Sequence, residues 1–386
     1  MARAASPSKP VAKRATKKDS AKSAVKSEAG RDGRIVRSLA PWFAKNGRDL
    51  PWRTLPRQAF PSLVSELMLQ QTQVSRVQEK FEPFLARFAS VRALAEAPES
   101  DVMAAWSGLG YYRRARLLHA CAKAIVRDHG GVIPGEIEKL EELPGIGRYT
   151  AGAIASIVFG ERAAIVDGNV CRVLQRLEAK EGHAGNKKVA DWAWKRAGQL
   201  VALTSRGEEV ARFNEGLMEL GATVCTPDGP KCGACPLRGE CASYRQGLTD
   251  SIPAPKPRAK RTRVHHDVVI VHRRGRSGSI EYLLEQRPER GLWAGMWQPP
   301  ASESPSESNL ALGGLLTKIG LRNIGCDESG GPIESVFHTT HREVLFRAWS
   351  VRVPDAPSEN GRRWVAKKAL GGVGISNAHL QLIMRA

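Results

Sequence analysis

The chain has 386 residues, with 59 lysines and arginines against 39 acids and a formal net charge of +20. At about 150 residues per domain, this length indicates two or three globular units, and 42% hydrophobic residues can supply their cores. No apolar stretch approaches the roughly 20 residues of a membrane-spanning helix, and the N-terminus lacks an apolar signal segment. The composition therefore disfavours a secreted or membrane protein and suggests a polyanionic partner.

Residues 1–30 contain eight basic residues, two acids and almost no large apolar side chain. Such a segment cannot bury a core, so we expect it to be disordered. It could be only a solubilising tail or a non-specific arm that tethers DNA. A mitochondrial presequence fits the composition only in part, because no amphipathic apolar face is visible.

Residues 31–247 show a helical pattern throughout. Apolar residues recur every three or four positions, with short Gly/Pro breaks between segments and no alternating strand pattern. Two such stripes are formed by Leu63, Leu67, Gln70, Val74 and Val77, and by Val170, Val173, Leu174 and Leu177. We expect an all-α region.

The pattern changes after a Pro- and Lys/Arg-rich segment, residues 248–263, which has the composition of an extended linker. Residues 264–386 contain β-rich runs at 266–272, 282–286 and 344–353, with helices expected near 308–319 and 376–386. These features predict a second, smaller domain of α+β type.

Four of the seven cysteines lie within residues 225–241, at Cys225, Cys232, Cys235 and Cys241. A cluster of this kind in a chain without a signal peptide indicates a reducing compartment and a metal site rather than disulfides. Zinc and a [4Fe–4S] cluster both accept four thiolates, so the spacing does not choose between them.

The segment Leu143-Pro-Gly-Ile-Gly147 lies between two expected helices. Gly145 and Gly147 would let backbone N–H groups approach a phosphate at a helix N-terminus. A helix–hairpin–helix of this kind contacts the DNA backbone, whereas the alternative is an ordinary turn between helices.

Two acids stand at positions suited to catalysis. Asp167 precedes a helix and is most simply its N-cap, where the positive helix end also favours an ionised carboxylate. Glu66 flanks the apolar stripe and could be an ordinary exposed acid. If it is half-buried, desolvation would make it a usable general acid.

Six motifs occur in one order along the chain. They are Glu66-Leu-Met-Leu-Gln-Gln-Thr-Gln-Val74, Gly108-Leu-Gly-Tyr-Tyr-Arg113, the glycine hairpin, Val166-Asp-Gly-Asn-Val170, Phe213-Asn-Glu215 and the cysteine quartet. Together they resemble the MutY-type adenine DNA glycosylases of the helix–hairpin–helix, endonuclease III-like superfamily, over about residues 35–386. The resemblance implies a monomer that binds duplex DNA, carries a [4Fe–4S] cluster and removes adenine mispaired with 8-oxoguanine or guanine.

The resemblance also assigns catalytic roles. The adenosine must leave the base stack before its glycosidic bond can be reached. Glu66 would protonate adenine N7, and Asp167 would stabilise the oxocarbenium-like sugar, with Tyr149 and Asn169 assisting. This is the two-carboxylate chemistry of glycoside cleavage.

Further residues match the family by position. By this resemblance Arg48, Leu50, Trp52, Arg53 and Glu215 lie in segments that line the adenine pocket, although Trp52 by itself would more often be a core residue. Gln71 and Tyr111 match side chains that wedge into the base stack, and Thr72 and Leu109 match positions near 8-oxoguanine.

Tyr149 stands where related lyases of the endonuclease III type have a Schiff-base lysine. A phenol cannot form an imine, so we expect a monofunctional glycosylase. The compartment would be the bacterial cytoplasm, at the nucleoid, or a eukaryotic nucleus or mitochondrion.

Residues 286–300 resemble the Nudix-like domain that follows the linker in MutY proteins. The carboxylate-rich helix that holds Mg²⁺ in hydrolytic Nudix enzymes is missing, so we expect lesion recognition and no pyrophosphatase activity. The family's Phe-Ser-His loop is best matched by Thr339-Thr340-His341, where Thr340 and His341 keep the hydrogen-bonding groups and Thr339 replaces the aromatic ring.

Three other interpretations remain possible. An endonuclease III-like lyase is disfavoured by Tyr149 and by the added C-terminal domain. A DNA-binding or redox iron–sulfur protein without catalysis is disfavoured by the combination of Glu66 with Asp167. A zinc-containing Nudix hydrolase lacks the required carboxylates.

Overall fold

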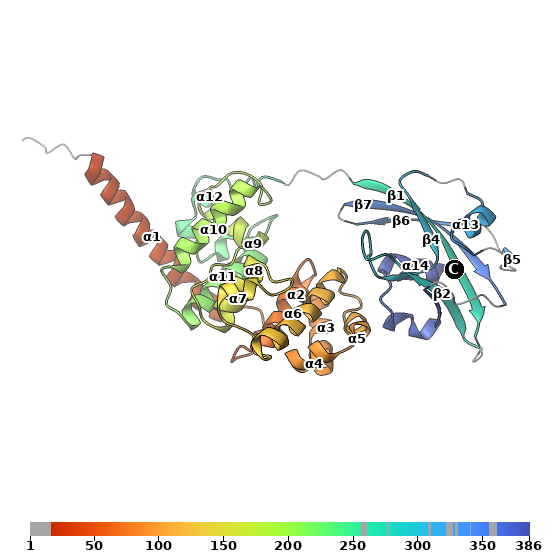
Figure 1. Cartoon of the computed structure of the whole chain (residues 1–386). Helices are drawn as coiled ribbons and strands as arrows, with labels where there is room; N and C mark the ends of the chain where they lie inside the picture. The colour runs from red at the N-terminus through yellow and green to blue at the C-terminus, as the bar shows by residue number, and fades with distance from the viewer. Residues whose placement is uncertain are drawn as a thin grey trace, which may run out of the picture. The chain divides into compact units, whose positions relative to one another are not determined.

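The computed structural model describes residues 17–255, 261–275, 278–307, 310–321, 327–328, 331–339, 341–354 and 361–386. The chain divides into two compact units, residues 1–49 with 148–256 and residues 50–147 with 257–386. Figure 1 labels the elements. No helix of the described residues is both long enough and apolar enough to cross a membrane.

The first unit is helical. It contains α1 (Lys17–Asn46), α8 (Arg148–Ala153), a π-helical turn (Ile154–Val158), α9 (Gly168–Leu177), α10 (Lys187–Val201), α11 (Glu208–Thr223), two short 3-10 turns (Cys232–Ala234 and Arg238–Glu240) and α12 (Ala242–Arg245). Its core joins the apolar faces of α1, α9, α10 and α11, including Ile35, Leu174, Leu200 and Phe213. The stripe predicted from Val170 to Leu177 is fully buried there, as expected.

The structure differs from the expected disordered tail, because α1 already begins at Lys17. Residues 31–46 of this helix are anchored by buried Ile35, Val36 and Leu39. The preceding segment is rich in alanine and lysine, which are good helix formers, so the helix can extend beyond its anchored part. Residues 1–16 lie outside the described residues.

The helical part of the second unit has its own buried core. It contains a 3-10 turn (Pro51–Arg53), α2 (Ala59–Leu69), α3 (Val74–Arg87), α4 (Val91–Glu96), α5 (Glu99–Ala105), α6 (Arg113–His129) and α7 (Ile137–Glu141). Leu63, Leu67, Val77, Phe84 and Trp106 are all buried. The stripe from Leu63 to Val77, predicted as one periodic segment, is split between α2 and α3 because the chain turns sharply at residues 70–73.

The C-terminal part of the second unit is built on one mixed sheet. Its elements are β1 (Thr262–Arg274), β2 (Ile280–Gln286), β3 (Trp297–Gln298), β4 (Ala301–Ser304), α13 (Leu312–Lys318), β5 (Asp327–Glu328), β6 (Ile333–His338), β7 (Arg342–Arg352), β8 (Arg362–Ala366), a 3-10 turn (Lys367–Gly372) and α14 (Asn377–Arg385). The central path is β3-β2-β1-β7-β5, with β1 and β7 parallel and the other pairs antiparallel.

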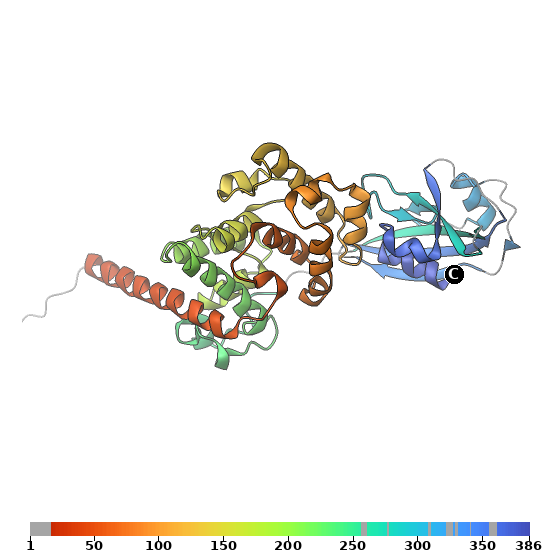
Figure 2. The ribbon, with the colours of Figure 1, turned by 90° about the horizontal axis from the view of Figure 1, so that it is seen from below.

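A helix covers each face of this sheet (Figure 2). Alternate residues of β1 face opposite sides, so that Val268 and Ile270 pack with α14 while Val269 and Val271 pack with α13. The predicted α+β architecture is confirmed, and so is the all-α character of residues 31–247.

The predicted linker, residues 248–263, is partly folded. Ile252 is buried, its carbonyl accepts a hydrogen bond from Arg176 Nε at 2.7 Å, and the Ala254 N–H donates to the Gly182 carbonyl. At the other end, Thr262 and Arg263 already belong to β1. Composition predicted an extended segment, because composition does not show that the Ile252 carbonyl is bound by the distant Arg176.

Candidate active site

Asp167 begins α9 as its N-cap, in the first unit. One carboxylate oxygen accepts the Val170 backbone N–H at 2.7 Å, and the other accepts the side-chain amide of Asn169 at 3.1 Å. The carboxylate is half-buried. The local interpretation as an N-cap is thus correct, and it fixes the orientation of the carboxylate at the same time.

Burial has the opposite effect on Asp167 from the one expected of a helix N-terminus. It raises the pKa of the carboxyl group, more strongly than the hydrogen bonds from Val170 and Asn169 and the charge of Arg172 lower it. Ionisation of this carboxyl group therefore costs free energy in the folded protein. A positive charge that forms beside the carboxylate would stabilise the ionised form.

Arg172 ties this site to the cysteine segment. It lies one turn into α9, and its Nη2 donates to Asn169 Oδ1 and to the Gly221 carbonyl, each at 2.8 Å. Its Nε donates to the Cys225 carbonyl, also at 2.8 Å. Sequence reasoning missed this residue, because its carbonyl partners Gly221 and Cys225 lie 49 and 53 positions away.

Helix α11 carries one expected site residue, Glu215, and contacts a second, Tyr149. Glu215 is buried on it, and the neighbouring Asn214 donates to Ser156 Oγ at 2.9 Å and to the Ala163 carbonyl at 2.8 Å. Tyr149, at the start of α8, donates its hydroxyl to the sulfur of Met218 at 3.4 Å. Tyr149 and Glu215 thus belong to the same folded unit as Asp167.

Arg48 is held by a second acid of α11 that the sequence did not point to. Its Nε and Nη2 donate to the two oxygens of Glu219 at 2.7 and 3.0 Å, and its backbone N–H donates to the same carboxylate. The Glu219 side chain is fully buried. Glu215 and Glu219 stand one helical turn apart, so a signal could have been found in their spacing.

The second unit carries the remaining expected residues of the helical region. Leu50 is buried, whereas Trp52 and Arg53 are half-buried in the 3-10 turn, where Trp52 meets Phe81 edge-on with ring centroids 5.5 Å apart. Glu66 is half-buried in the last turn of α2. Partial burial is the environment in which we expected this residue to be usable as a general acid.

The glycine hairpin joins α7 to α8, as predicted. Gly145 has φ +79°, and a Cβ there would lie 2.7 Å from Cβ of Leu117, so only glycine fits. Gly147 is exposed, and a Cβ added to it would meet no atom within 4 Å. Both the backbone geometry and the open face suit close approach of a ligand.

The residues expected near a lesion come from two turns of the second unit. Gln71 and Tyr111 are exposed and both have positive φ, at +57° and +47°. Thr72 donates its hydroxyl to the Leu109 carbonyl at 3.3 Å, so that the two turns lie side by side. Arg114, which sequence reasoning missed, contacts both turns.

The four cysteines line one cavity with about 310 Å³ of empty space, part of it open to solvent. Arg176 borders it and donates to the carbonyls of Thr226 and Pro227 at 2.6 and 2.8 Å. Burial raises the pKa of the Cys235 thiol to about 12, so a bound cation would have to supply the energy that ionises it. Among the described residues, no group of three or more His, Cys, Asp or Glu side chains is arranged to hold a single metal ion.

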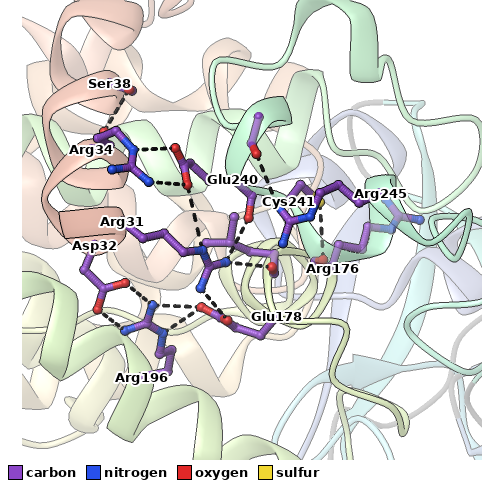
Figure 3. A network of polar contacts seen from close by, with 12 residues as sticks. Arg31, Asp32, Arg34, Ser38, Arg176, Glu178, Arg196, Glu240, Cys241 and Arg245 are labelled. Carbon is purple, nitrogen blue, oxygen red and sulfur yellow. Dashed lines mark hydrogen bonds and ion pairs between the residues drawn. The ribbon is translucent and has the colours of Figure 1, made fainter. Parts of the chain in front are cut away.

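A network of ion pairs connects the cysteine segment to α1 (Figure 3). Arg34 binds Glu240 through two hydrogen bonds at 2.7 and 3.2 Å, and Arg31 donates to Glu178 and to the Glu240 carbonyl. Arg196 joins the same network through Asp32 and Glu178. The network fixes Glu240, the residue before Cys241, against α1.

His341 lies exposed at the β6–β7 turn of the C-terminal part, and its carbonyl accepts the Thr262 N–H. Thr339 closes this turn, since its hydroxyl accepts the Arg342 N–H at 2.9 Å. The threonine thus contributes a hydrogen bond to the turn. Thr340 lies outside the described residues.

Comparison with known proteins defines the class. Residues 64–199 match the family described as HhH-GPD superfamily base excision DNA repair protein, and residues 268–385 match the NUDIX domain. A solved thermostable thymine-DNA glycosylase superposes on 57% of this chain and 99% of its own, with a TM-score of 0.50 and 27% identity. The helical region therefore has the fold of a base excision repair glycosylase.

Longer relatives narrow this class. The adenine DNA glycosylases of Mus musculus and Homo sapiens are each 33% identical to this chain over 88% of its length, and the matches cover 75% and 72% of those proteins. The Mycobacterium tuberculosis enzyme of the same name is 42% identical over 57% of the chain. The chain belongs to the adenine DNA glycosylases, hydrolases that cleave the N-glycosyl bond of adenine in DNA.

Gly221→Ala should impair adenine excision, because a Cβ at this position of α11 would lie 2.6 Å from Cβ of Asn169. Displacement of the α9 N-terminus should lower the single-turnover rate at least about tenfold. Gly198→Ala in α10 is the matched control, since its Cβ meets nothing within 4 Å and alanine favours the helix. Equal rates for the two variants would contradict this packing argument.

Asp167→Asn should raise the melting temperature at pH 7.5, because asparagine can also cap a helix and carries no buried charge. The folded state of the wild type binds the Asp167 proton more tightly than the unfolded state, so the stability contributed by this group is lost as pH rises through the folded pKa. The gain from Asp167→Asn should therefore shrink from pH 7.5 toward about pH 4. Thermal melts of both proteins across this range would refute the argument if the gain grew on acidification.

Proposed function

We propose that this enzyme removes adenine paired with 8-oxoguanine or guanine in duplex DNA, and that it does so without a lyase step. The observation that carries the proposal is the environment of Asp167. A half-buried carboxylate with a raised pKa, fixed at the N-terminus of α9, is suited to stabilise a nearby cation. Loss of adenine from its sugar produces such a cation.

The proposed reaction begins with extrusion of the adenosine from the stack. Glu66 protonates N7, and the bond between C1′ and N9 breaks with its electrons passing to the base, which leaves as neutral adenine. The sugar becomes an oxocarbenium-like cation that Asp167 stabilises. Addition of water at C1′, with release of its proton, leaves an abasic site.

Neighbouring groups of the first unit support this role of Asp167. Asn169 donates to one carboxylate oxygen and is itself held by Arg172. We assign an assisting role to Tyr149 on the same unit. The pocket for the base is assigned to five residues. Glu215 belongs to α11 and Arg48 is bonded to that helix, whereas Leu50, Trp52 and Arg53 lie at the 3-10 turn Pro51–Arg53.

DNA binding is assigned to exposed backbone and strained turns. Gly145 and Gly147 would offer backbone N–H groups to phosphates. Gln71 and Tyr111 would enter the stack in place of the extruded base, and Thr72 and Leu109 would lie near the opposite base. In the C-terminal part, Thr340 and His341 would read the lesion by hydrogen bonds.

The four cysteines are proposed to hold a [4Fe–4S] cluster. Four thiols around one cavity form the donor set of such a cluster, and the ion pairs of Figure 3 hold this segment against α1. When bound, the cluster would cross-link residues 225–241. Arg172 would transmit the position of Cys225 to Asn169 through its hydrogen bonds.

The substrate assignment predicts a specific product pattern. Duplexes with A:8-oxoguanine or A:G should yield strand breaks only after alkali, and a duplex with thymine glycol should yield none. Tyr149 lacks the amine needed for an imine, so borohydride should trap no stoichiometric protein–DNA adduct. Breaks without alkali, or efficient trapping, would identify a lyase instead.

Glu66→Gln and Asp167→Asn should each lower single-turnover adenine excision by at least about a thousandfold, because each removes a charge or proton needed in the transition state. Binding of the mispaired duplex should stay within about threefold of wild type, since neither substitution changes the side chain's size. Asp191→Asn is a matched control, because its side chain is exposed and pairs with Lys187 at the surface. Near-native rates in either active-site variant would remove that carboxylate from the mechanism.

A further inference from the structure

Arg114 is a buried arginine in the first turn of α6 that no assigned role explains. Arg114 is only 7% exposed, yet its guanidinium forms no ion pair with an acidic side chain among the described residues. The burial of an unpaired positive charge is costly unless many acceptors surround it. The acceptors around Arg114 therefore show which segments of the chain it holds in place.

One amino group of the guanidinium closes the end of α2. Nη1 donates to the carbonyls of Leu67 and Met68 at 2.8 Å each, and also to that of Gln70. The last carbonyls of a helix have no partner within the helix and carry partial negative charge. Arg114 thus fixes the helical turn that carries Glu66.

The other amino group connects two turns. Nη2 donates to Thr72 Oγ1 at 2.9 Å and to the carbonyls of Leu109 and Gly110 at 3.2 and 3.1 Å. These acceptors lie directly beside Gln71 and Tyr111. A single planar group therefore sets the distance between the two exposed side chains.

Stacking restricts the guanidinium further. Its carbon lies 5.4 Å from the ring centroids of both Trp106 and Tyr111, and Trp106 Nε1 donates to the Gly110 carbonyl at 3.1 Å. Trp106 is fully buried, whereas Tyr111 is half exposed. Arg114 is thus supported from the core and in turn supports the surface ring.

The backbone conformations at these turns need such support. Gln71 and Tyr111 occupy the left-handed region, which residues with a side chain adopt only when their surroundings hold them there. Arg114 binds the Gln70 carbonyl and the Thr72 hydroxyl on the two sides of Gln71, and the carbonyls of Leu109 and Gly110 just before Tyr111. Lysine could not replace these contacts, because an ammonium group has three donors at one point instead of a planar fork.

We infer that Arg114 is a positioning residue that presets Gln71 and Tyr111 for insertion into the base stack and thereby permits adenine extrusion. This inference rests on the proposed function, which assigns insertion to those two side chains. Arg114 itself touches neither the base nor the sugar in this scheme. Its effect is on the step before bond cleavage.

The test compares Arg114→Lys and Arg114→Met with Arg127→Met, a control on the same helix whose side chain is 73% exposed and pairs with the adjacent Asp128. A duplex with 2-aminopurine opposite 8-oxoguanine reports extrusion by its fluorescence. Single-turnover excision is measured on the matching A:8-oxoguanine duplex, binding is measured on an undamaged duplex, and melting temperature reports folding.

For Arg114→Lys, the fluorescence rise should be largely lost and excision should fall by about 10- to 100-fold, with binding of undamaged duplex within about threefold of the control. Wild-type extrusion and excision in Arg114→Lys would overturn the inference. So would a parallel loss of melting temperature, undamaged-duplex binding and excision, because that pattern marks a purely structural role. If Arg114→Met does not fold, the lysine variant decides. Failure of the proposed function is distinguishable, since the wild type itself would then release no adenine.

Discussion

The cost of holding a carboxylate at the N-terminus of α9 is the constraint on which the proposed active site depends. Asp167 is partly removed from water, and burial raises its pKa despite two hydrogen bonds and a nearby arginine. The packing around the site must therefore supply the free energy that holds Asp167 in place. It does so through buried packing of α9 against α10 and α11, in which every residue from Val170 to Leu177 is buried.

Buried arginines bonded to backbone carbonyls recur in this protein. Arg172 connects Asn169 to the Cys225 segment, Arg176 holds residues 226–227 and 252, and Arg114 holds the turns around Gln71 and Tyr111. Each connects a helix to at least one irregular segment of the chain. A planar group with five donors can satisfy several carbonyls at once, so one buried arginine can hold an irregular segment that lacks a ladder of backbone hydrogen bonds.

The C-terminal part combines a mixed sheet with the turn to which we assign lesion recognition. Parallel pairing of β1 with β7 places two long strands in its centre, and α13 and α14 each cover one face. The turn at Thr339 and His341 connects β6 to β7 and is therefore attached to one of the two long central strands, β7. Thr339 closes this turn by accepting the Arg342 N–H.

Sequence alone determined the fold class, the order of the motifs and the identity of the candidate acids, because periodicity, glycine turns and cysteine spacing are local properties. It also identified Asp167 as an N-cap, because this role depends on a hydrogen bond from Val170, only three positions away. It could not determine that Leu63–Val77 would break into two helices, or that residues 248–255 would fold back onto the first unit. Both segments are held by arginines from elsewhere in the chain: Arg114 binds the Leu67 carbonyl 47 positions away, and Arg176 binds the Ile252 carbonyl 76 positions away. Tertiary structure decided them because an unpaired carbonyl becomes costly only once folding has removed it from water.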